Sequence, residues 1–258
     1  IMSKKLASGA QGIVLDVKVG SGAIMPTYEG SVALAQAMVE IGTRAGRHVS
    51  ALLTGMDEPL GSHVGNRLEV KEAIDILRGE SAGPLLTVSL RLGAQLLIAS
   101  GIADTPEAGQ ALLQKALENG SGLEKLRQMI TAQGGDASVC DHPETLADAP
   151  IVRDLPCAQA GYIAHMETAQ LGYAAQEFGA GRKQKTDVID PRVGFIMRCR
   201  VGDRMEKGQP LCTVYAADEA SFARAKAMIE GAITLSDAPA PREKLLYALV
   251  TNTGVQTL

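Results

Sequence analysis

Ile13-Val14-Leu15-Asp16-Val17-Lys18-Val19 is the stretch that decides the fold. It is rich in β-branched residues and nearly unbroken, as is typical of a buried strand. Val49-Ser50-Ala51-Leu52-Leu53-Thr54 repeats this pattern further along the chain. Between the two, apolar residues at helical spacing predict a helix over about 28–45, with Thr27 as its N-cap and Gly46 at its end. A strand, a crossover helix and a second strand form a βαβ unit, so the strands are predicted to be parallel.

Further helices are predicted around this unit. A short helix over 1–8 precedes it, and the pattern after it predicts helices over 68–78, 84–100, 106–118 and 122–133. In the helix over 68–78, Val70, Ile74 and Leu77 are predicted to face inward. Four consecutive helices after a βαβ unit indicate a mixed α/β architecture.

The pattern changes in a connecting region over 134–157, which is rich in Gly and Pro. Short strands beginning at 160 and over 193–199, 210–215 and 245–250 are predicted beyond it, with a turn at 201–204 and helices over 167–178 and 218–230. We therefore expect an α/β protein. A parallel-sheet α/β domain with flanking helices is predicted over 1–155, followed by a small α+β barrel-sandwich-like domain over 156–258.

Composition excludes several classes of protein. The net charge is −4 and the sequence pI is about 5.6, which disfavours a large basic face for nucleic acid. No apolar run approaches the roughly 18 residues of a membrane span, and no secretion signal is recognisable. The four cysteines form no CxxC pair, which favours reduced thiols in the cytoplasm. Because the chain opens inside a helical pattern, we expect it to be an N-terminally truncated piece.

The loop after the first strand carries Gly20-Ser21-Gly22. Its backbone amides could approach an anion, with Lys18 beside them, or the glycines could simply form a tight turn. Asp16 lies among apolar residues, so its carboxylate needs a partner; it could hold a functional loop or cap a neighbouring turn. Lys4 begins a helix, where a cation opposes the helix dipole. Lys4 is therefore either a functional residue or an ordinary surface lysine.

A second loop, dense in turn residues, contains Leu60 and His63 and leads to a helix with Glu72. Free carbonyls in an irregular loop, together with one carboxylate, suit a hard cation such as K⁺ or Ca²⁺. Alternatively, Glu69 and Glu72 only decorate the first turns of a helix. The histidines show no spacing for a metal site or catalytic pair. The segment 201–211 resembles the hairpin of lipoyl and biotinyl carrier domains, but 211–221 contains no lysine, so no carrier role is expected.

Several blocks taken together resemble the thymidine phosphorylase and pyrimidine-nucleoside phosphorylase family. They occur in the order of the family and cover most of the chain: IMSKKLA at 1–7, DVKVGSGA at 16–23, MDEPLG at 56–61, GN at 65–66, LEVKEA at 68–73 and GAGR at 179–182. The resemblance implies an α/β enzyme that cleaves a pyrimidine nucleoside with phosphate, giving free base and pentose 1-phosphate. It also implies a cytoplasmic homodimer without an organic cofactor.

The resemblance also implies roles for particular residues. Lys4 matches the lysine that hydrogen-bonds a carbonyl of the pyrimidine, and Ile1 belongs to the apolar wall of that site. Leu60 and His63 match the positions whose backbone carbonyls, with the carboxylate at Glu72, bind K⁺ or Ca²⁺. No catalytic residue is assigned with certainty.

The chain also departs from the family pattern. The phosphate-binding Lys-x-Ser glycine loop has no match here, so we expect this polypeptide alone to be inactive. Ile24 stands where many relatives have Phe, which leaves the preference for thymine or uracil open. The alternatives are a nucleotide-directed relative resembling AMP phosphorylase and a noncatalytic binding module.

Overall fold

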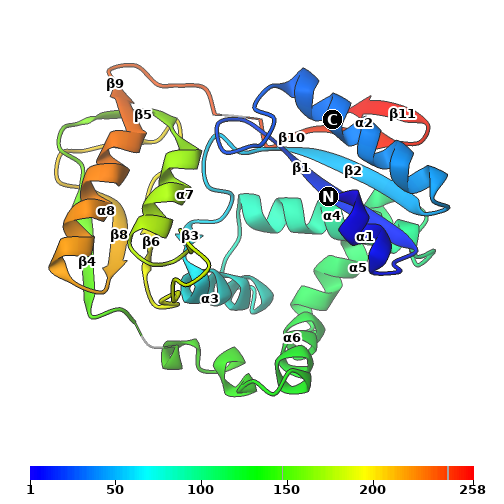
Figure 1. Ribbon diagram of the computed structural model, residues 1–258, viewed down its shortest axis with the longest axis horizontal. Helices are drawn as coiled ribbons and strands as arrows, with labels where there is room; N and C mark the ends of the chain where they lie inside the picture. Colours follow the sequence, from blue (N-terminus) through cyan, green and yellow to red (C-terminus); the bar gives the residue numbers. More distant parts are fainter. Residues whose placement is uncertain (147, 243) are drawn as a thin grey trace. The chain divides into compact units, whose positions relative to one another are not determined.

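A computed structural model of the chain describes residues 1–146, 148–242 and 244–258 (Figure 1). It confirms the predicted mixed α/β class. The chain forms two compact units. The first contains Ile1–Met56, Ala82–Asn119 and Lys244–Leu258, and the second contains Asp57–Ser81 and Gly120–Glu243.

The first unit is a four-stranded sheet in the order β1-β2-β10-β11, with helices on both faces. Figure 1 shows α2 on one side of β1 and β2 and α4 on the other. The elements are α1 Met2–Ala7, β1 Gly12–Val19, α2 Tyr28–Arg44, β2 His48–Gly55, α4 Pro84–Ala99, α5 Pro106–Glu118, β10 Leu246–Thr251 and β11 Gly254–Thr257.

The predicted βαβ unit is confirmed. Strands β1 and β2 are parallel from Gly12↔His48 to Val19↔Gly55, and the Thr27 hydroxyl accepts a hydrogen bond from the Gly30 amide at the start of α2. The sheet is not purely parallel, however, because β10 pairs antiparallel with β2. The strand predicted over 245–250 therefore belongs to the first unit's sheet, between β2 and β11.

The second unit contains two sheets, in the orders β3-β6-β8-β4 and β7-β5-β9. Its elements are β3 His63–Val64, α3 Asn66–Leu77, α6 Ser121–Ala132, 3-10 helices at Ala137–Cys140 and Pro143–Thr145, β4 Ile151–Pro156, β5 Gly161–Met166, α7 Thr168–Glu177, β6 Gly194–Met197, β7 Arg204–Met205, β8 Pro210–Ala216, α8 Glu219–Ala232 and β9 Ile233–Ser236. One hydrophobic core holds residues of both sheets and of α7 and α8, among them Phe195, Val214, Ile163 and Leu171.

Some sequence predictions for this unit were wrong in detail. The connecting region predicted over 134–157 ends in a strand, β4. The turn predicted at 201–204 is present, except that Arg204 already belongs to β7. Val70 faces solvent and is 43% exposed, whereas Leu68, Glu72, Ile74 and Ile76 are the buried residues of α3. The predicted boundary between a domain over 1–155 and a domain over 156–258 stays a prediction.

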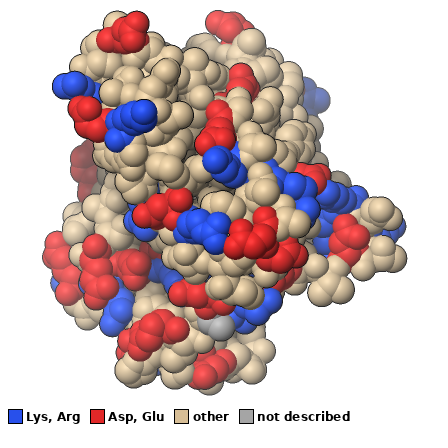
Figure 2. All heavy atoms as spheres, turned by 90° about the vertical axis from the view of Figure 1, so that its left-hand side faces the viewer, with Lys and Arg blue, Asp and Glu red and all other residues tan. Residues whose placement is uncertain are grey.

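None of the described helices has both the length and the apolarity to cross a membrane. On the face drawn in Figure 2, acidic and basic side chains are interspersed. That face carries no continuous basic surface of the kind that binds a phosphate backbone.

Candidate functional site

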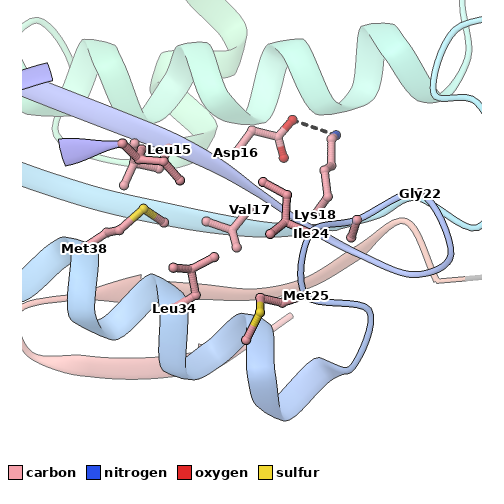
Figure 3. Close-up of a pocket in the computed structure, with 11 residues that line it drawn as sticks. Leu15, Asp16, Val17, Lys18, Gly22, Ile24, Met25, Leu34 and Met38 are labelled. Atoms are coloured by element: carbon pink, nitrogen blue, oxygen red, sulfur yellow. Dashed lines mark ion pairs between the residues drawn. The ribbon is translucent and has the colours of Figure 1, made fainter. Parts of the chain in front are cut away.

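Strand β1 places different chemistry on its two faces. Leu15 and Val17 pack into the core with Ala35 and Met38 of α2. Because side chains alternate along a strand, Asp16 and Lys18 point to the opposite face, where they form an ion pair of 2.7 Å (Figure 3).

Thr54 of β2 completes this group. Its side chain is fully buried, accepts a hydrogen bond from Lys18 Nζ at 2.9 Å and donates one to Asp16 Oδ1 at 2.5 Å. Asp16 therefore has the partners that its position demands. Sequence reasoning missed Thr54, because its register opposite Lys18 is a property of the sheet.

The loop between β1 and α2 is closed by its own backbone. The Gly20 amide donates to Pro26 O at 3.1 Å, and the Gly22 amide donates to Met56 O at 2.9 Å. Gly20 has a φ of 121°, a value that favours glycine. Since both glycine amides already have backbone partners, the geometry favours the tight-turn interpretation over an anion site.

Ser31 on α2 fixes the far side of this loop. It is fully buried, and its hydroxyl lies 2.8 Å from Met25 O and 3.0 Å from Lys18 O. The loop consequently holds Ile24 and Met25 at the edge of β1. The Ile24 side chain is 84% exposed there.

A hollow of about 190 Å³ lies beside this loop (Figure 3). Its apolar wall includes Ile1, Ile24, Met25, Leu34 and Met38. Pockets for drug-sized ligands measure roughly 300–1,000 Å³, so this hollow suits a smaller group such as a single ring.

Helix α1 carries Lys4, and Ile1, the other residue predicted to contact the base, immediately precedes the helix. Its anchor is Met2, which is 6% exposed and packs near Gly42 of α2. Ile1 lines the hollow, but Lys4 does not and is exposed to solvent. The structure thus brings Ile1 to the hollow and leaves Lys4 outside its lining.

Glu72 is the centre of the second predicted site. It is 6% exposed, and its carboxylate accepts hydrogen bonds from the Ser62 amide at 2.8 Å, the Ser62 hydroxyl at 2.9 Å and the His63 amide at 3.2 Å. Burial alone would raise the pKa of Glu72, but the hydrogen bonds from His63 and Ser62 outweigh it and lower the pKa from 4.5 to about 2. The side chain is therefore an anion at neutral pH, and it binds the neighbouring loop instead of lying exposed on the first turns of the helix.

Leu60 lies in the loop that leads into β3, whose first residue is His63. A Cβ at Gly61 would overlap Glu72 Oε2, so the loop lies directly against the carboxylate. The His63 amide donates to Glu72, away from β6, and in an antiparallel ladder the His63 carbonyl then points to that same side. The oxygens of this loop fit a hard cation, although Leu60 O already accepts one hydrogen bond, from Arg200.

This donor set is one of oxygens only. Among residues 1–146, 148–242 and 244–258, no group of three or more His, Cys, Asp or Glu side chains could hold a metal ion. The four cysteines are buried and free, and burial raises the pKa values of Cys199 and Cys212 to about 12. These thiols are consequently poor metal ligands at neutral pH.

Sequence reasoning also missed Arg200 and Glu58, which hold the start of this loop. Arg200 forms an ion pair with Glu58 at 3.2 Å, and the other carboxylate oxygen of Glu58 accepts the Val201 amide at 2.8 Å. An arginine in a turn looks like a solvated residue, so no sequence signal pointed to it.

Comparison with known proteins covers both parts of the chain. Residues 1–123 match the model of the glycosyl transferase family a/b domain, and residues 162–236 match that of the pyrimidine nucleoside phosphorylase C-terminal domain. The chain is 43% identical over 251 residues to a pyrimidine-nucleoside phosphorylase of Bacillus subtilis strain 168, covering 97% of this chain and 58% of the relative. It is 44% identical over 216 residues to one of Staphylococcus aureus strain USA300, covering 84% of this chain and 50% of the relative.

The chain thus spans between half and three fifths of the length of these relatives. The a/b domain is followed along the chain by the C-terminal domain of pyrimidine nucleoside phosphorylases, and the sequence identity extends over nearly the whole chain. The chain belongs to the pyrimidine-nucleoside phosphorylase family.

Proposed function

We propose that this chain is part of an enzyme that cleaves pyrimidine nucleosides with inorganic phosphate, releasing the free base and a pentose 1-phosphate. The observation that carries the proposal is the 43% identity to a pyrimidine-nucleoside phosphorylase over 97% of the chain. The hollow lined by Ile1, Ile24 and Met25 supports it, because its size and apolar wall suit a single heterocyclic ring.

In this proposal Lys4 contacts the pyrimidine. Phosphate attacks C1′ of the sugar as the bond to the base breaks, and negative charge spreads onto the carbonyl oxygens of the base. An ammonium donor at such an oxygen binds the transition state more strongly than the substrate. Since Lys4 lies outside the lining of the hollow, this contact requires the base to extend beyond the hollow toward α1.

The oxygens of Leu60, His63 and Glu72 are proposed to hold K⁺ or Ca²⁺. The buried, anionic carboxylate of Glu72, which lies against the loop that carries Leu60, supports this proposal. When bound, the cation supplies positive charge that offsets Glu72 and fixes the loop over 60–63. The enzyme is proposed to need phosphate as co-substrate and no organic cofactor.

Further parts of the proposal concern the whole protein. We propose that it acts as a cytoplasmic homodimer. We also propose that the 258-residue chain by itself does not turn over substrate, because no residues matching the family's phosphate-binding loop were found in it.

The test is a pair of measurements. The protein used contains this chain and is as long as its relatives. It is incubated with thymidine or uridine, in the presence and in the absence of inorganic phosphate, and the free base released is quantified by chromatography. Phosphate-dependent release of base is the expected result. Binding of thymine or uracil without any phosphorolysis would instead indicate a noncatalytic binding module.

A further inference from the structure

The segment between β6 and β7 reaches the 58–60 loop through one side chain. Arg200 donates from Nη1 to Glu58 and to Pro59 O, and from Nη2 to Leu60 O at 3.1 Å. The side chains of Arg200 and Glu58 are 25% and 23% exposed. A single guanidinium therefore binds three consecutive residues of the loop.

Arg200 is itself held in place by Asp203. Its backbone amide donates to Asp203 Oδ2 at 2.8 Å, while Asp203 Oδ1 accepts a hydrogen bond from Arg242 at 2.9 Å. A planar guanidinium with fixed donors imposes directions on its acceptors, which a flexible ammonium does not. Arg200 is thus built to set the orientation of the loop carbonyls.

The carbonyl whose orientation matters for the proposed cation site is that of Leu60. A carbonyl oxygen has two lone pairs, so Leu60 O can accept from Arg200 and still bind a cation. The other side of the loop is fixed as well, since the Met197 amide donates to Ser62 O at 2.8 Å. Both sides of the loop around Glu72 are therefore tied to the segment that runs from β6 to β7.

We propose that Arg200 is a positioning residue for the cation site. It orients the Leu60 carbonyl so that this oxygen, the His63 carbonyl and the Glu72 carboxylate converge on one ion. This inference rests on the cation site proposed above.

The positive charge of Arg200 repels a nearby cation. The ion pair with Glu58 at 3.2 Å offsets that charge, so orientation governs the outcome. Loss of Arg200 is then expected to weaken cation binding, whereas a purely repulsive role would strengthen it. The sign of the effect separates the two roles.

The experiment is a cation titration of the purified chain, followed as the thermal unfolding midpoint. KCl, or CaCl2 in a second arm, replaces tetramethylammonium chloride at constant ionic strength. Wild type is compared with Arg200→Gln, with Arg200→Lys, which keeps the charge but loses the fork, and with Arg204→Gln. Arg204 is a matched control because its ion pair with Glu206 is 65% exposed on both sides.

The expected result is a cation-specific rise of the wild-type midpoint. The concentration for half of that rise should increase about tenfold in Arg200→Gln, as is common for groups that orient metal ligands. It should increase less in Arg200→Lys and stay unchanged in Arg204→Gln. If Arg200→Gln does not fold, Arg200→Lys decides.

An unchanged or lower half-saturation concentration in the Arg200 variants would overturn the inference. So would a wild-type chain that responds to neither K⁺ nor Ca²⁺, because no ion would then be there to position. That failure leaves phosphorolysis itself untouched, and the base-release assay measures phosphorolysis separately.

Discussion

Glu72 accepts both hydrogen bonds that Ser62 can donate, from the backbone amide at 2.8 Å and from the hydroxyl at 2.9 Å. With the His63 amide at 3.2 Å, three donors converge on a carboxylate that is 6% exposed. The loop over 60–63 is therefore folded around a buried negative charge. Hydrogen bonds to a charged acceptor are stronger than those between neutral groups, so this side chain organises the loop.

Replacing Glu72 by Gln should destabilise the second unit by about 2–3 kcal/mol, because charged hydrogen bonds become neutral ones at a buried position. Urea unfolding at pH 7, followed by circular dichroism, measures this loss. Glu80→Gln is the control, since Glu80 is 57% exposed and lies 3.5 Å from Arg78. Equal stabilities of the two variants would show that Glu72 does not hold the loop.

The low pKa of Glu72 also predicts an acid dependence. Its pKa is about 2 in the folded chain against 4.5 for an ordinary glutamate. The stabilisation is therefore complete well above pH 4.5 and is lost as the pH falls from 4.5 toward 2. Its full size is about 3 kcal/mol, of which about 2 kcal/mol is lost by pH 3. Urea unfolding of wild type and Glu72→Gln at pH 7 and pH 3 isolates this contribution, and a difference that does not shrink at pH 3 would contradict it.

Gly42 of α2 packs tightly against Met2 of α1 and Val49 of β2. A Cβ at this position would overlap Val49 and lie 3.1 Å from Met2 Cε. Gly42→Ala should cost about 1–3 kcal/mol through overpacking, despite the better helix propensity of Ala. Gly172 in α7 is the matched control, because nothing lies within 4 Å of its Cβ position. Gly172→Ala should stabilise the chain by about 0.5–1 kcal/mol, and a stabilising Gly42→Ala would refute this packing.

Thr54 links Asp16 and Lys18 across two strands. Thr54→Val keeps the shape but removes the hydroxyl, so both charged groups lose a hydrogen bond; the expected cost is about 1–2 kcal/mol. Thr131 is exposed on α6 and provides the comparison, with Thr131→Val expected within about 0.5 kcal/mol of wild type. The same urea assay applies. A Thr54→Val variant as stable as wild type would mean that the ion pair needs no third partner.

Much of the first unit could be predicted from sequence because its signals are local. The apolar run over 13–19, the helical spacing after Thr27 and the run over 49–54 each specify an element, and the crossover length specifies a parallel pair. The pairing of β10 with β2 could not be predicted, since it joins segments far apart in the chain. Strand β4 was missed because it lies at the edge of its sheet, where Arg153, Asp154 and Pro156 are tolerated.

In the candidate site, too, local sequence signals could be predicted and contacts between distant residues could not. Ile1, Lys4, Leu60, His63 and Glu72 were predicted through motif resemblance, which requires only the order of residues. The contacts of Arg200 with Glu58 and of Thr54 with Asp16 depend on tertiary structure. In single-sequence reasoning such residues look like ordinary surface or strand residues. The inward face of α3 was misjudged at Val70 because one of its buried positions is the charged residue Glu72, which apolar spacing does not reveal.

The central claim is that the Lys4 ammonium stabilises the departing pyrimidine. The most direct measurement is kcat/KM for thymidine phosphorolysis by a protein that carries this chain at the length of its relatives, compared with its Lys4→Ala variant and with Lys115→Ala on α5 as control. A charge-assisted hydrogen bond contributes about 1.5–3 kcal/mol, so Lys4→Ala should lower kcat/KM by about tenfold to a hundredfold, while Lys115→Ala leaves it unchanged. An unaltered kcat/KM in Lys4→Ala would contradict the account.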